Sequence, residues 1–263
     1  MNAKSQTVTL DDLEVHYLEA GIGSPLLLLH GGTATAESLG DALPRLAERY
    51  RVFALDTRGH GKTSNPLQRL SYAQFADDVA AFISRLDIER PLIVGYSDGG
   101  QTALEFGLRH PGKAAGLVLG GTVSEPLDIY AEELRKWGFP AAGQVNFDTL
   151  ATVFGPYFDR LKVAHSHHYG PEYWKAFMLQ ISELWHTLPH YSETQLASIS
   201  DPSLVIMGDR DALGGIDQAH RLYRNLGAGE LSIIANAGHD AVGKPLFWDA
   251  VMEFLERHSG TQG

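Results

Sequence analysis

The sequence predicts an α/β protein in which a mostly parallel, doubly wound sheet of eight strands carries helices on both faces. Three observations lead to this prediction. Short continuous apolar runs recur along the chain, segments with helical spacing lie between several of them, and polar or glycine-rich residues follow where the runs end. A continuous apolar run is typical of a strand that is buried on both faces of a parallel sheet.

Two kinds of segment supply the predicted strands. Residues 7–10 and 15–18 flank Asp11 and Asp12 and are expected to form a hairpin. The apolar runs are residues 25–29, 52–55, 92–94, 117–119, 204–207 and 231–234. Ligands of doubly wound sheets bind beyond the carboxyl ends of the strands, so a functional site is expected where these runs end.

Apolar residues at helical spacing predict helices between the strands. One helix is expected to contain Phe75, Val79, Phe82, Ile83 and Leu86, with Ser71 as its N-cap. The last helix is expected to contain Phe247, Val251, Phe254 and Leu255, with Pro245 in its first turn.

One long segment breaks the alternation of strands and helices. Residues 123–200 contain no clear buried strand and are rich in aromatic side chains. We expect this segment to form a helical cap, inserted between the fourth and fifth apolar strands. Residues 1–122 and 201–263 then form the core that carries the sheet.

Composition narrows the classes of function. Lys and Arg number 21 and Asp and Glu number 32, which gives a net charge of −11 and disfavours binding to nucleic acids or anionic membrane surfaces. The chain has no cysteine, and this excludes disulfides and a cysteine nucleophile. Because the N-terminus has no apolar signal core and the longest aliphatic run is only residues 26–29, a cytoplasmic protein is expected. Homo-oligomerisation is left open.

Residues 95–99, GYSDG, fit the pattern G-x-S-x-G of a nucleophilic serine on a tight turn between a strand and a helix. The turn projects the hydroxyl from the sheet and costs a non-glycine residue about 1–3 kcal/mol. Glycines on either side let the strand and helix pack closely. The pattern is short, but here it follows the apolar run at 92–94 and precedes a helix-like segment at 101–109. The alternative is that Ser97 only caps that helix.

A nucleophilic serine needs a general base and an acid that orients the base. His239 follows the strand at 231–234, and Asp209 and Asp211 both follow the strand at 204–207. Glu125 comes after another strand and is a third candidate for the acid. All these residues are expected at the same edge of the sheet.

Five motifs together resemble the α/β-hydrolase superfamily over nearly the whole chain. They are HGGT at 30–33, DTRGHG at 56–61, GYSDGG at 95–100, GDRD at 208–211 and AGHD at 237–240. GYSDGG and the later stretch EYWKAF are similar to valacyclovir hydrolase and related biphenyl-hydrolase-like esterases. The chain is thus identified as an α/β-hydrolase with an inserted cap.

The resemblance implies a role for each motif. Ser97 is the expected nucleophile, His239 the base and Asp211 the acid, while the amides of Asp98 and Gly32 form the oxyanion hole. The expected activity is the hydrolysis of a small carboxylic ester through an acyl-enzyme, without a cofactor. A lactonase, a carbon–carbon bond hydrolase or a perhydrolase would use the same triad. A ligand-binding protein that kept the fold without catalysis is the alternative from another class.

Asp98 has two interpretations. A carboxylate at the start of a helix is favoured by the helix dipole by about 0.3–1 kcal/mol. Alternatively, its side chain faces the pocket, where it would attract a substrate amine and repel a substrate acid. Among the cap aromatics, Trp137, Tyr157 and Trp185 are expected to line an apolar substrate pocket.

Three further polar features are predicted to be structural. His30 is expected to hold its loop by hydrogen bonds, and Asp56 and Arg58 to form an ion pair or to brace their turn. The histidines of HSHH at 165–168 lack a clustered carboxylate, so no metal site is expected.

Overall fold

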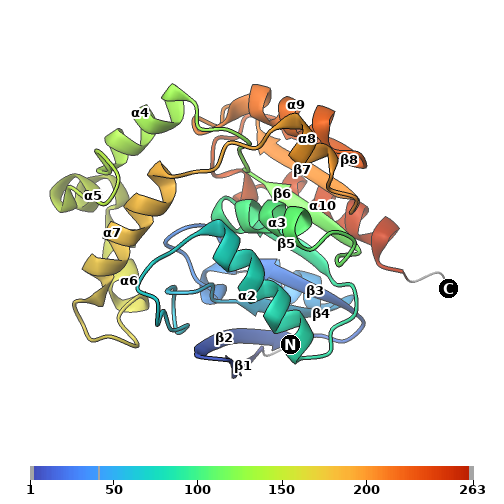
Figure 1. Cartoon of the computed structure of the whole chain (residues 1–263), viewed down its shortest axis with the longest axis horizontal. Coiled ribbons are helices and arrows are strands. Elements are labelled where there is room, and N and C mark those ends of the chain that lie inside the picture. Colours follow the sequence, from blue (N-terminus) through green and yellow to red (C-terminus); the bar gives the residue numbers. More distant parts are fainter. Residues whose placement is uncertain (1–2, 41, 261–263) are drawn as a thin grey trace.

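A computed structural model describes residues 3–40 and 42–260 of the chain. Its centre is an eight-stranded sheet, and Figure 1 shows how the helices surround it. The strand order is β1-β2-β4-β3-β5-β6-β7-β8. β1 pairs antiparallel with β2 and β2 with β4, while all remaining neighbours are parallel. The strands are β1 (Lys4–Leu10), β2 (Leu13–Ala20), β3 (Ser24–Leu29), β4 (Tyr50–Leu55), β5 (Leu92–Tyr96), β6 (Gly116–Gly120), β7 (Ser203–Gly208) and β8 (Gly229–Ile234). The predicted α/β sheet is confirmed.

Burial explains why these segments form strands. Every residue of β5, β6 and β7 is buried, as expected for interior parallel strands covered on both faces. β1 lies at the sheet edge and alternates between exposed and more buried residues, because one of its faces meets solvent.

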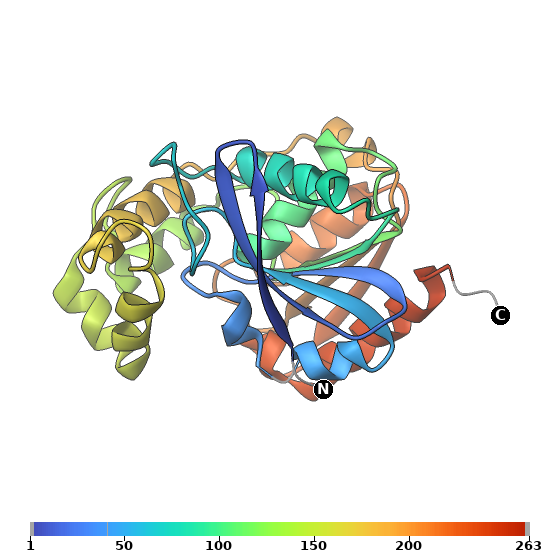
Figure 2. The same ribbon diagram turned by 90° about the horizontal axis from the view of Figure 1, so that it is seen from below.

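Helices cover both faces of the sheet (Figure 2). One hydrophobic cluster joins one face to helices α2, α3 and α9, and a second joins the other face to α1 and α10. These helices are α1 (Ala42–Ala47), α2 (Tyr72–Arg85), α3 (Asp98–Arg109), α9 (Gly215–Asn225) and α10 (Pro245–His258). The hydroxyl of Ser71 accepts the Gln74 amide at 3.2 Å, and Pro245 begins α10, so both predicted helix starts are confirmed.

Five helices lie between β6 and β7. They are α4 (Asp128–Trp137), α5 (Phe147–Phe154), α6 (Pro156–Ala164), α7 (Tyr173–His186) and α8 (Glu193–Ala197). We call α4–α7 the inserted helices; they lie to one side of the sheet (Figure 1). They share a third hydrophobic cluster, which reaches Tyr72 and Phe75 of α2, whereas Leu196 of α8 packs into a sheet cluster. The outer ends of the predicted core, residues 1–2 and 261–263, lie outside the described residues.

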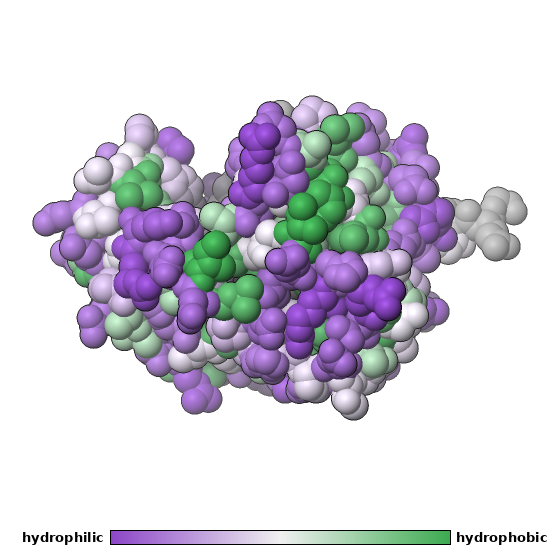
Figure 3. Space-filling view, turned by 90° about the horizontal axis from the view of Figure 1, so that it is seen from above, coloured by the Kyte–Doolittle hydropathy of each residue, from purple (hydrophilic) through white to green (hydrophobic). Residues whose placement is uncertain are grey.

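The surface seen from above is hydrophilic over most of its area and carries separate apolar patches (Figure 3). It is indented between the inserted helices and the rest of the molecule. In residues 3–40 and 42–260, no helix combines the length and apolar character needed to cross a membrane.

Candidate active site

Ser97 occupies the turn between β5 and α3, with φ 55° and ψ −117°. Its hydroxyl makes no capping hydrogen bond to the helix, which argues against the alternative that it is only a helix cap. A Cβ atom at Gly95 would lie 2.0 Å from the carbonyl oxygen of Gly99, and one at Gly99 would lie 2.2 Å from that of Leu29. The two glycines are therefore required because the backbones of β5, α3 and β3 meet here.

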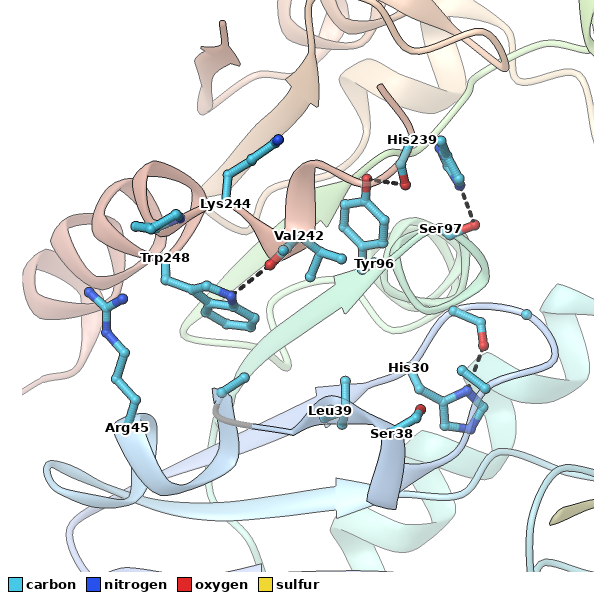
Figure 4. Close-up of a pocket in the computed structure, with 16 residues that line it drawn as sticks. His30, Ser38, Leu39, Arg45, Tyr96, Ser97, His239, Val242, Lys244 and Trp248 are labelled. Atoms are coloured by element: carbon cyan, nitrogen blue, oxygen red, sulfur yellow. Dashed lines mark hydrogen bonds between the residues drawn. The ribbon is translucent and has the colours of Figure 1, made fainter. Parts of the chain in front are cut away.

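Loops after β7 and β8 bring an acid and a histidine to this serine. His239 Nε2 lies 2.9 Å from Ser97 Oγ (Figure 4). On the other side of the ring, His239 Nδ1 lies 2.8 Å from Asp211 Oδ2. The Asp211 side chain is almost fully buried, and its other oxygen accepts the Leu213 amide at 3.0 Å. Asp211 is thus held in place and orients the imidazole toward Ser97.

The other two candidates for the acid lie elsewhere. Asp209 accepts the Ala237 amide at 3.0 Å and braces its loop, and backbone amides lower the pKa of its carboxyl. Glu125 Oε1 lies 3.6 Å from Arg221 Nε, so this carboxylate pairs with an arginine. Of the three carboxylates, only Asp211 bonds to His239.

The predicted oxyanion hole lies between the loop after β3 and the start of α3. Among the residues that the structure describes, neither the Gly32 amide nor the Asp98 amide donates a hydrogen bond to another residue. A Cβ atom at Gly32 would lie 2.5 Å from Asp98 Oδ2 and 2.6 Å from Trp185 Cζ2. A side chain at position 32 would therefore have to displace the Asp98 carboxylate or the Trp185 ring.

Ser97 and His239 stand between two cavities of different size. The larger, of about 560 Å³, runs from the serine past Tyr96 and Val242 to Arg45 and Trp248 (Figure 4). The smaller, of about 30 Å³, lies between α3 and the inserted helices. Its lining consists of Tyr72, Ser97, Asp98, Gln101, Gly121, Val123, Tyr130, Leu134, Trp137, Trp185, Leu188, Leu213 and His239.

Comparison with known proteins decides the family. The family model described as "alpha/beta hydrolase fold" matches residues 24–244. The chain belongs to the α/β-hydrolase family.

Individual relatives of this α/β-hydrolase have varied names. It is 30% identical to the 2-hydroxy-6-oxo-6-(2'-aminophenyl)hexa-2,4-dienoic acid hydrolase of Metapseudomonas resinovorans, over 96% of this chain and 91% of that protein. It is 28% identical to a non-heme haloperoxidase of Rhodococcus erythropolis, over 77% of this chain and 80% of that one. A crystal structure of a serine hydrolase involved in carbazole degradation superposes with a TM-score of 0.77 at 24% identity, covering 97% and 100% of the two chains. That likeness shows the shared fold.

The three aromatic residues predicted for the substrate pocket of the hydrolase do not lie together. Trp137 and Trp185 line the smaller cavity. Tyr157 lines neither cavity that contains Ser97; its hydroxyl donates to the Thr33 carbonyl at 2.7 Å, and it borders a separate hollow. Composition alone could not separate these aromatics, because their position depends on how the inserted helices pack.

The Asp98 carboxylate lines the smaller cavity, as its second interpretation required. Oδ1 accepts the Tyr72 hydroxyl at 2.9 Å, and the Trp185 indole N–H lies 2.9 Å from both oxygens. Burial raises the pKa of the Asp98 carboxyl to about 6. Sequence reasoning missed Tyr72 as a site residue, since no local pattern relates it to a residue 26 positions away.

His30 has the expected bracing role. Its Nδ1 donates to the neighbouring Gly31 carbonyl at 2.7 Å, and its Nε2 accepts the Thr57 amide at 3.1 Å. The ring therefore holds the loop after β3 against the loop after β4.

The predicted ion pair between Asp56 and Arg58 is wrong. Arg58 forms two hydrogen bonds of 2.7 and 2.8 Å with Asp78 of α2. Asp56 bonds His16 Nδ1 at 2.8 Å and also accepts the Lys62 amide at 2.9 Å, so it does brace its turn. The two side chains diverge because each finds a partner from another element, which sequence proximity cannot reveal.

His165 of the HSHH stretch fastens the end of α6 to the core. Its Nδ1 accepts the Gly61 amide at 3.0 Å, its Nε2 donates to the Thr33 carbonyl at 2.8 Å, and its ring stacks on Phe177 at 4.2 Å. Only a neutral imidazole can make both bonds, and burial lowers the pKa of His165 to about 4.

Acidification is expected to weaken this attachment. An unfolded histidine takes up a proton near pH 6.5, whereas folded His165 is protonated only near pH 4. The contribution of His165 to the stability of the fold therefore falls as the pH drops from about 6.5 to about 4. Unfolding by urea should show that the advantage of the native protein over His165→Gln shrinks by about 1–3 kcal/mol between about pH 7.5 and about pH 4.5. The lowered pKa values of His30 and His60 also reduce stability as the pH falls, whereas the raised pKa of Asp98 increases it. Because the native protein and the variant share these three groups, their effects cancel in the difference. A constant advantage at both pH values would contradict this prediction.

Proposed function

We propose that this hydrolase is a serine esterase that cleaves small carboxylic esters through an acyl-enzyme. The observation that carries the proposal is the continuous hydrogen-bonded series from Asp211 through His239 to Ser97, at 2.8 and 2.9 Å. A serine hydroxyl becomes a useful nucleophile only with such a base and orienting acid.

The chemistry then follows from the positions of these groups. Ser97 Oγ attacks the ester carbonyl carbon as His239 Nε2 takes the hydroxyl proton, and the carbonyl oxygen becomes an oxyanion that accepts the amides of Gly32 and Asp98. Collapse of this intermediate breaks the ester C–O bond, and His239 gives its proton to the leaving alcohol. Water repeats the sequence on the acyl-enzyme and releases the carboxylic acid.

The two cavities suggest where each half of the substrate binds. Water must reach the acyl-enzyme from the side that the alcohol has left, and the larger cavity of about 560 Å³ offers that access. The acyl group then occupies the cavity of about 30 Å³, which favours short acyl chains. The inserted helices act in this proposal as the cap that limits acyl size and excludes bulk water.

Carbon–carbon bond hydrolysis is the second candidate, because the relative from Metapseudomonas resinovorans is named for a dienoic acid substrate. Among the described residues, the smaller cavity is lined by Asp98 and by no Lys or Arg, which disfavours an acidic group there. A substrate acid would have to point along the larger cavity toward Arg45 and Lys244. The ester proposal requires no such group.

The test combines turnover with labelling. Initial rates would be measured on p-nitrophenyl acetate, butyrate and octanoate, an α-amino ester, and a 2-hydroxy-6-oxodienoate, and a fluorophosphonate label would be located by mass spectrometry. We expect acetate to be hydrolysed fastest among the acyl chains and the label to sit on Ser97. Turnover of the dienoate alone would favour the second candidate, and absence of both turnover and label would favour a binding protein.

A further inference from the structure

Asp98 contacts three parts of the site through its backbone and its carboxylate. Its backbone begins α3 beside Ser97, one oxygen packs against the place where a Gly32 Cβ would stand, and both oxygens receive the Trp185 indole N–H. The residue is only 7% exposed, so these contacts are shielded from water.

Trp185 is the polar attachment of the inserted helices at this point. It lies in the last turn of α7, is 6% exposed, and forms a wall of the smaller cavity. Its other ring contacts are apolar, with Phe139 at 4.9 Å and Trp137 at 6.2 Å. An indole has a single N–H donor, and here Asp98 receives it. A directional bond to a buried carboxylate fixes position more strictly than apolar packing does.

We propose that the hydrogen bond between Asp98 and Trp185 sets the size of the acyl cavity and the position of the Gly32 amide. This makes both side chains positioning residues that determine acyl-chain specificity. The inference rests on the esterase function proposed above, because it assigns the smaller cavity to the acyl group.

Loss of the bond has two expected consequences. The end of α7 is released from α3, so the wall formed by Trp185 can move outward and admit longer acyl chains. The loop at Gly32 loses the ring edge that confines it, so the oxyanion is bound less well. The first effect changes the relative rates for different chains, and the second lowers kcat on the shortest one.

Three variants separate the bond from general packing. Trp185→Phe keeps an aromatic ring but removes the donor. Asp98→Asn keeps an acceptor oxygen for Trp185, since its amide nitrogen can face the Tyr72 hydroxyl instead. Trp174→Phe makes the same change in the same helix, but Trp174 packs against Phe147 and Phe158 at 5.4 Å and lines neither cavity that contains Ser97.

The experiment measures kcat and KM for p-nitrophenyl acetate, butyrate, hexanoate and octanoate. We expect Trp185→Phe to raise the ratio of kcat/KM for octanoate to kcat/KM for acetate by about tenfold. The same variant should lower kcat for acetate by about tenfold, with little change in the KM for acetate. Asp98→Asn should keep the native chain-length ratio, and Trp174→Phe should match the native enzyme throughout. If Trp185→Phe does not fold, Asp98→Leu removes the acceptor and should give the same shift.

Each outcome decides one point. An unchanged ratio in Trp185→Phe, or an equal shift in Trp174→Phe, would overturn the inference while leaving the esterase function intact. A native enzyme that hydrolyses none of the esters would instead overturn the esterase function.

Discussion

Ser97→Ala is expected to lower kcat on p-nitrophenyl acetate by about 10⁴- to 10⁶-fold, the largest effect of any single substitution in this hydrolase. Ser97 Oγ is the atom that would form the acyl-enzyme, and alanine offers no substitute nucleophile. Alanine can occupy the same turn with φ 55° at a similar cost, so the thermal midpoint should change little. Stopped-flow and steady-state assays with the same ester measure the loss.

Ser198→Ala is the matched control for this substitution. Ser198 is an exposed serine that follows α8, donates to the Gln195 carbonyl at 2.7 Å and lines neither cavity that contains Ser97. Its variant should retain native rates. If Ser97→Ala kept a substantial fraction of the native rate, another group would be the nucleophile, and the proposed mechanism would be wrong.

Asp211→Asn is expected to lower kcat by about 10⁴-fold with the fold retained. The Asp211 carboxylate accepts the Nδ1 proton of His239, which leaves Nε2 free to take the proton of Ser97. An asparagine amide can donate to Nδ1 and so favour the tautomer that carries its proton on Nε2. That tautomer cannot act as the base.

Asp209→Asn, two positions away in the same loop, controls for the loss of a carboxylate as such. Asp209 bonds the Ala237 amide and not His239, so its variant should lose some stability and keep most of its activity. Near-equal losses of kcat in the two variants would show that activity depends on the conformation of this loop and not on the orientation of His239 by Asp211. Circular dichroism of both variants checks that the fold is preserved.

Much of the fold was predictable because its determinants are local. The apolar runs that became β3 to β7 are largely buried, because a strand covered on both faces needs a nearly uninterrupted run of apolar side chains. The run that became β8 differs: this strand lies at the edge of the sheet, most of its residues are half-buried, and Leu231 is exposed. The turn at Ser97 was predictable from its local G-x-S-x-G pattern, and Gly95 is required by a contact with the backbone of Gly99 only four residues on. The close contact of Gly99 with Leu29 of β3, by contrast, forms only when the strands pair. Short helices such as α1 were not predicted, since six residues carry too little periodicity.

The candidate triad was predictable only in part. Local motifs placed Ser97, His239 and two aspartates at strand ends, and parallel strands bring those ends to one edge. Residue patterns alone could not choose among Asp209, Asp211 and Glu125. The tertiary structure separates them through loop geometry, in which Asp211 bonds His239 while Asp209 turns back to Ala237.

Residue types and their spacing therefore determined the class of fold, the serine turn and the candidates for the catalytic residues. Tertiary structure alone decided that Arg58 pairs with Asp78, that Tyr157 bonds Thr33 outside the two cavities that contain Ser97, and that Asp98 bonds Trp185. The physical reason is the separation along the sequence over which each effect acts. Backbone strain and burial periodicity act over a few residues, whereas these contacts join residues 20 to 124 positions apart and exist only after the elements have packed.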